Sequence, residues 1–150
     1  MTDTDRIDDH ILQTLSEEGR IPNTELADRV GLSPSACLRR VQALERLGII
    51  RGYRAVLDYA LLGRGFTAYI TVGLNDHTTA AQSAFEKAIA TAPEVVECHN
   101  ITGAVEYLLR VEVADLGAYK MFHAETLGRL PQVNALTTFV VMASPKDLRS

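Results

Sequence analysis

The stretch from Asn23 to Gly48, NTELADRVGLSPSACLRRVQALERLG, decides the fold of the N-terminal part of the chain. Its apolar residues recur at helical spacing on both sides of a tight break at Gly31 and Leu32, which predicts two short amphipathic helices. Asn23 is a candidate N-cap for the first helix. Gly31 is suited to end that helix, because glycine readily adopts positive φ. The inward stripe of this helix is Leu26, Ala27 and Val30.

The second helix is predicted to begin at Ser33 or Pro34 and to end at Gly48. Ser33 offers a hydroxyl as N-cap, and proline is favoured at the first helical position, where its missing N–H needs no partner. At about 100° per residue, one stripe of this helix is apolar and faces the core, namely Leu38, Val41, Leu44 and Leu47. The opposite stripe consists of Ala36, Arg39, Arg40 and Ala43.

The opposite stripe has the composition of a DNA-reading surface. Small residues let a helix lie close to another surface, and the adjacent Arg39 and Arg40 suit phosphates and guanine edges. This pattern is typical of a recognition helix in a DNA major groove. The alternative is a solvated helix face that never touches DNA, because short helix pairs with exposed arginines occur in many proteins.

The distribution of charge favours the nucleic-acid interpretation. Residues 1–28 carry eight acidic residues against two arginines, a balance of −6. Residues 29–54 carry six arginines against Glu45, a balance of +5, although the whole chain has a net charge of −4. Positive charge is therefore concentrated on the second helix and the residues that follow it, as expected of a nucleic-acid-binding face.

The sequence on either side of the helix pair completes a small domain. A helix from about Asp5 to Glu18 precedes the pair, with Ile7, Ile11, Leu12 and Leu15 facing inward. After Gly48, the segment Ile49 to Leu57 alternates in a way that is consistent with a short strand or wing, on which Arg51 and Arg54 would reach neighbouring phosphates.

The run from Asp5 to Leu57, with IDDHIL and EEGRIPNTELADRVGLSPSACLRRVQALERLGIIRGYRAVL, resembles the N-terminal domain of the Lrp/AsnC (feast/famine) family of prokaryotic transcriptional regulators. The resemblance continues through the C-terminal half. It implies a sequence-specific regulator that binds double-stranded DNA through a helix-turn-helix, winged-helix-like domain at residues 1–60. The expected contacts are the serines near the start of the recognition helix, its small and basic residues, and the arginines beyond it: Ser33, Ser35, Ala36, Arg39, Arg40, Arg51 and Arg54.

The second half of the chain, residues 61–150, has a different periodicity. The helical pattern ends in Asp58 to Gly65, and strand-like alternation begins at Phe66. The predicted elements are strands at Phe66 to Leu74, Val95 to Ile101, Tyr107 to Val113 and Val133 to Met142, and helices at Thr79 to Thr91 and Leu116 to Leu127. The order βαββαβ is that of the ferredoxin-like fold, with both helices on one face of an antiparallel sheet, so the chain as a whole is of the α+β class.

The face of this sheet that the helices leave open is predicted to bind a second copy of the chain. Alternation assigns to it residues too apolar to remain in water, namely Tyr69, Cys98, Leu108, Leu136, Val140 and Met142. The family resemblance implies the same, because the C-terminal domains of that family dimerise through their sheets and the dimers often form tetramers or octamers.

The resemblance also implies an effector site at the turn between the second and third strands. The family binds amino acids or related small molecules there, at a turn that usually reads Gly-Asp-x-Asp-Tyr. This chain has Thr102 followed by Gly103-Ala104-Val105-Glu106-Tyr107, so Ala104 replaces the first Asp and Glu106 the second. Glu106 would hold an ammonium group and the backbone N–H groups of the turn a carboxylate. The alternative is a plain hairpin with Gly103 in the turn and Glu106 as a solvated charge.

Other functions have less support in the sequence. No nucleophile with a plausible base, no carboxylate pair and no metal-ligand spacing stands out, and Cys98 and His99 lie on opposite faces of a strand, so neither an enzyme nor a bound metal or cofactor is expected. Cys37 and Cys98 are expected to be small buried or half-buried residues. The sequence shows no apolar run of about 18 residues and no signal peptide, so we expect a cytoplasmic protein without a membrane partner. A small-molecule-sensing or assembly module that does not bind DNA is the remaining alternative.

Overall fold

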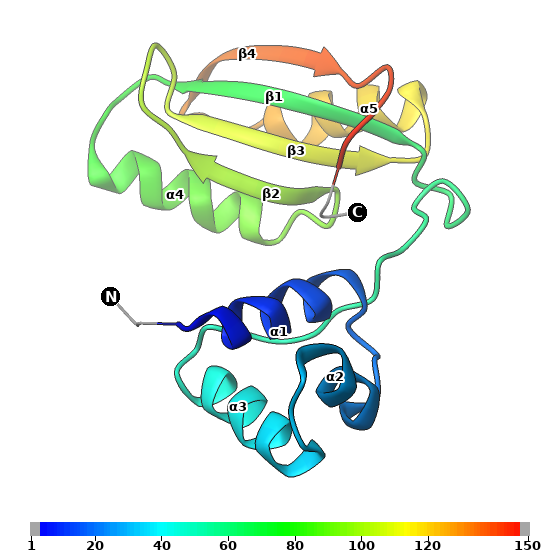
Figure 1. Ribbon diagram of the computed structural model, residues 1–150. Helices are drawn as coiled ribbons and strands as arrows, with labels where there is room; N and C mark the ends of the chain where they lie inside the picture. Colours follow the sequence, from blue (N-terminus) through cyan, green and yellow to red (C-terminus); the bar gives the residue numbers. More distant parts are fainter. Residues whose placement is uncertain (1–3, 148–150) are drawn as a thin grey trace. The chain divides into compact units, whose positions relative to one another are not determined.

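The computed structural model describes residues 4–147 and separates into two compact units, one ending at Val56 and the other starting at Leu57 (Figure 1). The first unit is all-helical, with α1 (Arg6–Glu17), α2 (Asn23–Val30) and α3 (Pro34–Arg46). Its core is formed by residues from all three helices and the loop after α1: Ile11, Ile21, Leu26, Ala27, Cys37 and Leu44. None of the described helices is both long and apolar enough to cross a membrane.

The break between α2 and α3 has the predicted geometry. Gly31 has φ of 72°, the left-handed conformation that ends α2. Ser33 caps α3, because its Oγ accepts a hydrogen bond of 3.3 Å from the N–H of Ala36, and Pro34 is the first helical residue. The expectation that Asn23 caps α2 was wrong: Asn23 is the first helical residue, and its Nδ2 instead donates to the carbonyl oxygen of Pro34 at 2.9 Å. This bond ties the starts of the two helices together.

The segment Ile49 to Leu57, which was expected to form a short strand or wing, contains no strand in the structure. Residues 51–58 are in neither helix nor strand. A strand needs a neighbour to receive its backbone hydrogen bonds, and the strands of the described chain all pair within one sheet of the second unit.

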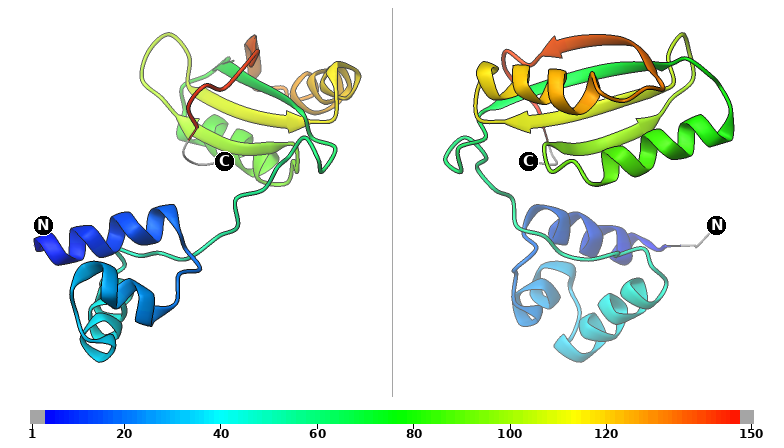
Figure 2. Two further views of the ribbon diagram at one scale, coloured as in Figure 1. Left: turned by 45° about the vertical axis from the view of Figure 1, so that its right-hand side comes forward. Right: turned by 180° about the vertical axis from the view of Figure 1, so that it is seen from behind.

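The second unit has the predicted βαββαβ order. It contains β1 (Phe66–Leu74), α4 (Thr79–Ala90), β2 (Val95–Asn100), β3 (Tyr107–Val113), α5 (Leu116–Phe122) and β4 (Val133–Val140). The strands form an antiparallel sheet in the order β2-β3-β1-β4, and both helices cover the same face (Figure 2). The ferredoxin-like α+β prediction is confirmed for this unit.

The predicted second helix of this unit ends in a π-helix, η1 (His123–Leu127). The N–H of Gly128 donates to the carbonyl oxygen of His123, five residues earlier, at 2.8 Å. Leu116 is the first residue of α5 after the Asp115 cap, and its side chain is 63% exposed.

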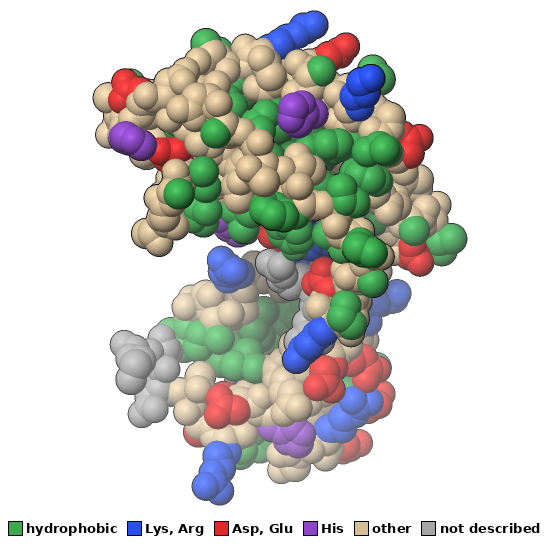
Figure 3. Space-filling view, turned by 90° about the horizontal axis from the view of Figure 1, so that it is seen from above, with side chains coloured by type: hydrophobic (Ala, Val, Ile, Leu, Met, Phe, Trp, Pro, Cys, Tyr) green, Lys and Arg blue, Asp and Glu red, His purple; other side chains and the backbone are tan. Residues whose placement is uncertain are grey.

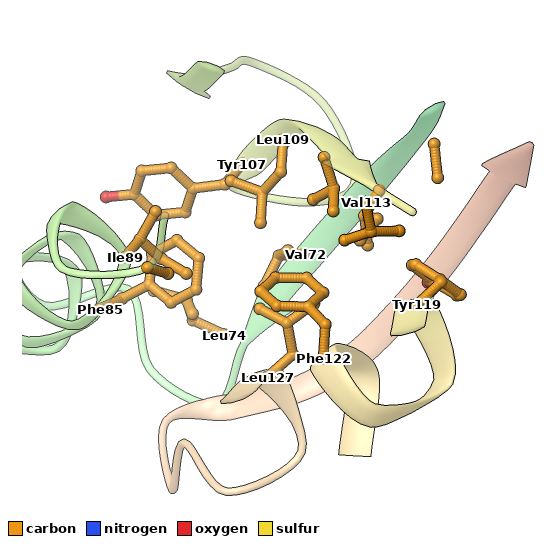
Figure 4. Packing of buried hydrophobic residues seen from close by; sticks show 14 residues of the cluster. Val72, Leu74, Phe85, Ile89, Tyr107, Leu109, Val113, Tyr119, Phe122 and Leu127 are labelled. Carbon is orange, nitrogen blue, oxygen red and sulfur yellow. The ribbon is translucent and has the colours of Figure 1, made fainter. Parts of the chain in front are cut away.

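The core of the second unit lies between the sheet and its two helices (Figure 4). Phe85 of α4 packs against Tyr107 of β3 with ring centroids 4.6 Å apart, and both side chains are buried. Burying an aromatic side chain of this size contributes roughly 1.5–3 kcal/mol to folding. The face formed by Ala68, Ile70, Val72 and Leu74 of β1 is buried as alternation predicts.

The open face of the sheet is less apolar than predicted. Tyr69 lies on it, opposite Arg110, and Leu108 lies opposite Thr71 on the same face. The register places three other expected members on the helix-covered face, since each is opposite a buried residue: Cys98 opposite Leu109, Leu136 opposite Val72 and Val140 opposite Ala68. Met142 lies beyond β4 and is 98% exposed.

Charged residues take part of the open face instead. Nη2 of Arg110 lies 3.0 Å from Oε1 of Glu112, and Nη1 of Arg110 lies 3.3 Å from Oδ2 of Asp147 in the segment after β4. Glu112 is buried, and its Oε2 has no hydrogen-bond partner among the described residues.

Candidate DNA-binding and effector sites

The exposed stripe of α3 is displaced by about one position from the predicted one. Cys37 and Leu44 are buried and Val41 is half-buried, so the inward stripe passes through Cys37. Leu38 and Leu47, which were expected to face the core, are 45% and 61% exposed. A helix that turns Cys37 inward turns Leu38 and Arg39 outward together.

Most of the candidate DNA contacts are accessible. Ser33, Ser35 and Arg39 are exposed along the first turns of α3, and Ala36 is half-buried. Ser33 Oγ and Ser35 Oγ are 3.3 Å apart, so two hydroxyls meet at the N-terminus of the helix, where backbone N–H groups favour anions. Arg51 and Arg54 are exposed in the segment after α3.

Arg40 lies elsewhere than predicted. Its Nη1 is 2.8 Å from Oδ2 of Asp5 and 2.9 Å from Oδ1 of Asp8, so it faces α1 and not the outward stripe. These two hydrogen bonds raise the pKa of the Arg40 guanidinium. The pKa of Asp5 is lowered by the N–H of Asp8, which donates to its side chain, and by Arg40. Arg39 and Arg40 are adjacent in the sequence, but Arg39 is exposed to solvent whereas Arg40 contacts α1.

Arg29 is also ion-paired with acidic residues of the same chain, which changes the charge pattern expected from the sequence. Nη2 of Arg29 lies 2.6 Å from Oε1 of Glu25 and 2.9 Å from Oε2 of Glu18, and its pKa is raised mainly by the hydrogen bond to Glu25. Arg39, Arg46 and Arg51 are exposed and form no ion pair within residues 4–147. These three arginines lie on the outward side of α3 and just beyond it.

Gln42 is an exposed residue that the sequence analysis did not single out. It follows Ser35 and Arg39 at helical spacing on the outward stripe. Glutamine binds adenine edges in the major groove, so it belongs with the candidate contacts. Taking Cys37 as a core residue in the helical projection would have identified it.

The candidate effector turn connects β2 to β3. The N–H of Ile101 donates to the carbonyl oxygen of Glu106 at 2.8 Å and closes the loop. Gly103 has φ of 129°, where a side chain would be strained. Thr102, Gly103 and Ala104 are exposed and Val105 is half-buried, so the tip of the turn is open to a ligand.

Glu106 is bound from two directions within the chain. Its Oε2 accepts a hydrogen bond of 2.7 Å from the N–H of Leu74, and its Oε1 lies 2.7 Å from Nδ1 of His77. The side chain is only 12% exposed. Glu106 is therefore not the solvated charge of the plain-hairpin alternative, and an incoming ammonium group would meet a carboxylate that already has partners.

Tyr107 points in the opposite direction, into the core. Its hydroxyl donates to Oε1 of Glu86 on α4 at 2.6 Å, and its side chain is 1% exposed (Figure 4). Burial and the hydrogen bond to Glu86 raise the pKa of Tyr107 to about 12. Tyr107 thus anchors the end of the turn beneath α4. In residues 4–147, no group of three or more His, Cys, Asp or Glu side chains could hold a metal ion.

Comparison with known proteins connects both sites to one family. A model described as winged helix-turn-helix DNA-binding matches residues 4–51, and a model described as Lrp/AsnC ligand binding domain matches residues 67–150. The chain belongs to the Lrp/AsnC family. It is a DNA-binding transcriptional regulator of the Lrp/AsnC type, with a ligand-binding domain that contains the β2–β3 turn.

Relatives within the Lrp/AsnC family cover nearly the whole chain. The leucine-responsive regulatory protein of Escherichia coli K12 is 44% identical over 145 residues, which are 97% of this chain and 88% of that protein. A transcriptional regulator from Neisseria meningitidis, solved in complex with L-Met, superimposes with a TM-score of 0.92 at 36% identity, covering 97% and 94% of the two chains. An AsnC family regulator from Agrobacterium tumefaciens has a TM-score of 0.91 at 31% identity, covering 98% and 95%.

Proposed function

We propose that this Lrp/AsnC-type regulator reads a specific double-stranded DNA site by placing the exposed stripe of α3 in the major groove. The observation that carries the proposal is the alignment of Ser35, Arg39 and Gln42 on the outward side of a helix that starts with a serine cap and a proline. Arginine pairs with guanine and glutamine with adenine, so this stripe has the chemistry of base readout.

The other candidate contacts position the helix. Ser33 and Ser35 bind phosphate at the N-terminus of α3, and Ala36 allows the helix to lie close to the DNA. Arg51 and Arg54 bind flanking phosphates from the segment after α3. In this proposal, residues 1–60 form the DNA-binding domain and residues 61–150 the dimerisation and effector domain.

The regulator acts as a homodimer that assembles further into tetramers or octamers. The open face of the sheet exposes apolar side chains, among them Phe139 at 55%, and hydrophobic side chains are spread over the second unit (Figure 3). Tyr69 lies directly opposite Phe139 on that face. A second copy would cover these side chains, and two recognition helices about one helical turn apart would read a roughly palindromic site.

The proposed effector is an amino acid or a related small molecule, bound at Thr102, Gly103, Ala104, Val105, Glu106 and Tyr107. The open tip of the turn and the carboxylate of Glu106 support this assignment, as does the L-Met complex of the Neisseria regulator. Tyr107 acts as the buried anchor of the turn. We further propose that the protein has no enzymatic activity, needs no cofactor and works in the cytoplasm, where the DNA of a prokaryote lies.

The decisive experiment selects bound fragments from genomic DNA with the full-length protein and then measures affinity against salt, with and without a pool of amino acids. Specific binding with a steep salt dependence is expected, and Arg39→Ala should cost roughly 1–3 kcal/mol and relax one base preference. Failure to select any fragment would overturn the DNA assignment in favour of a sensing or assembly module. Calorimetry that detects no heat for any amino acid would overturn the effector assignment.

A further inference from the structure

Arg40 connects α3 to the first turn of α1. Asp5 is the N-cap of α1, and its Oδ1 accepts hydrogen bonds of 2.9 Å from the N–H groups of Ile7 and Asp8. Oδ2 of Asp8 accepts from the N–H of Asp5 at 3.4 Å, which completes a capping box. Each aspartate therefore uses one carboxylate oxygen to cap α1.

The second oxygen of each aspartate is bound by one nitrogen atom of Arg40. Nη1 lies 2.8 Å from Oδ2 of Asp5 and 2.9 Å from Oδ1 of Asp8. The Asp8 side chain is 18% exposed and that of Arg40 33%, so this contact is partly shielded from water. The carboxylates are held by the backbone of α1, and a guanidinium bound to both is held with them.

We propose that Arg40 is a positioning residue that fixes the orientation of α3 relative to α1 and thereby sets how the neighbouring Arg39 meets DNA. This inference rests on the proposed function of α3 as the DNA-reading helix. It assigns different roles to two arginines that are adjacent in the sequence: Arg39 contacts DNA, and Arg40 holds the helix that carries it.

The charge of the cluster argues against direct phosphate binding by Arg40. Asp5, Asp8 and Arg40 together carry a net charge of −1, so a phosphate approaching Arg40 would be repelled by the two aspartates. It would also have to replace two hydrogen bonds that are already formed. The exposed Arg39 has neither obstacle.

Asp8→Asn separates the two roles because they predict opposite signs. If Arg40 positions α3, Asp8→Asn weakens specific DNA binding, by about threefold to thirtyfold as is typical of coupled contacts. If Arg40 binds phosphate, the same substitution removes one of the two negative charges that compete for the guanidinium, so binding tightens. Asp9→Asn is the matched control, since it removes the same charge from the same helical turn and Asp9 does not contact Arg40.

The salt dependence of Arg40→Ala provides the second measurement. A positioning role predicts weaker binding with an unchanged slope of log affinity against log salt, whereas loss of a phosphate contact reduces the slope by about 0.9. The double variant with Asp8→Asn should bind as weakly as Arg40→Ala alone, because without Arg40 the charge of Asp8 has no guanidinium to hold. Each affinity is calculated from the concentration of folded protein, and urea unfolding of each variant gives the folded fraction.

The outcomes are distinguishable from a failure of the proposed function. If the wild-type protein selects no DNA, the assignment of α3 itself fails. If the wild type binds and the Asp8→Asn and Asp9→Asn variants bind equally well, or Asp8→Asn binds more tightly, the positioning role is refuted. Should Arg40→Ala not fold, the sign of the effect in Asp8→Asn still decides between the two roles.

Discussion

Nδ1 of His77 lies 2.7 Å from Oε1 of Glu106, so the carboxylate of the proposed effector turn is already in contact with a side chain of the same protein. An effector ammonium group that bound Oε1 would have to replace His77. Because Oε2 is occupied by the N–H of Leu74, the other oxygen offers no easier route.

His77→Ala is therefore expected to strengthen effector binding. The variant leaves Oε1 of Glu106 accessible and keeps the bond from Leu74 intact. Isothermal titration calorimetry with the amino acid that binds the wild type should give a dissociation constant lower by about twofold to fivefold, the range of a weak exposed ion pair. Equal or weaker binding by the variant would show that the effector does not use this carboxylate. His10→Ala, at an exposed position in α1, controls for loss of a histidine elsewhere.

The raised pKa of Tyr107 predicts a loss of stability at alkaline pH. The ordinary tyrosine pKa is 10, whereas that of folded Tyr107 is about 12. The neutral side chain is preferred in the folded state, so its stabilising contribution is fully present below pH 10 and is lost as pH rises from 10 to 12. Tyr107→Phe, which cannot ionise, should lose about 2 kcal/mol less than the wild type over this interval. Urea unfolding at pH 9 and pH 11.5 measures the difference, and parallel losses in both proteins would contradict it.

Ser33 and Ser35 should respond differently to substitution by alanine. Ser33→Ala removes the oxygen that accepts from the N–H of Ala36, so it should lower the free energy of unfolding by about 1 kcal/mol. Ser35→Ala removes a hydroxyl that caps no helix, so it should leave stability nearly unchanged and weaken DNA binding alone. Thermal unfolding and DNA affinity of both variants test this, and equal stabilities would refute the capping role.

Gln42→Ala tests the displaced outward stripe of α3. The variant is expected to bind its selected site more weakly by roughly 1–3 kcal/mol and to lose discrimination at one base pair. Glu45→Ala is a suitable comparison, because Glu45 is exposed on the same helix and acidic. A repeated selection from randomised DNA that returns the same preferences for wild type and Gln42→Ala would exclude base readout by Gln42.

The fold of both units could be predicted from sequence because its signals are local. Gly31, Ser33 and Pro34 define the helix break through backbone conformation and capping, and alternation in Phe66–Leu74 defines the first strand. The orientation of side chains on α3 was harder, because Cys37 is less obviously apolar than Leu38. Treating Leu38 as a core residue rotated the predicted outward stripe of α3 about the helix axis, so that Arg40 was wrongly placed on it.

Contacts between residues distant in sequence, and a shift in strand pairing, account for three other errors. Asp5 and Asp8 lie more than 30 residues from Arg40 in sequence, and no local pattern indicates that they bind it. On the open sheet face, the pairing of β2 with β3 shifts between Val95 and Glu97, so simple alternation put Cys98 on the wrong side. The bonds from Leu74 and His77 to Glu106 likewise join segments that are distant in sequence.

The π-helix η1 has a consequence for chain length. The hydrogen bond from the N–H of Gly128 to the carbonyl oxygen of His123 spans five residues, so residues five apart lie toward the same side of the helix. Phe122 and Leu127 are five residues apart, and both are buried. In an α-helix, five residues turn by roughly 140° beyond a full turn. Either Phe122 or Leu127 would then face solvent. Deleting the exposed Ala124 would restore α-helical bonding with Leu127 four residues after Phe122 and still facing inward. We therefore expect the protein to lose one residue at the end of this helix and keep its core.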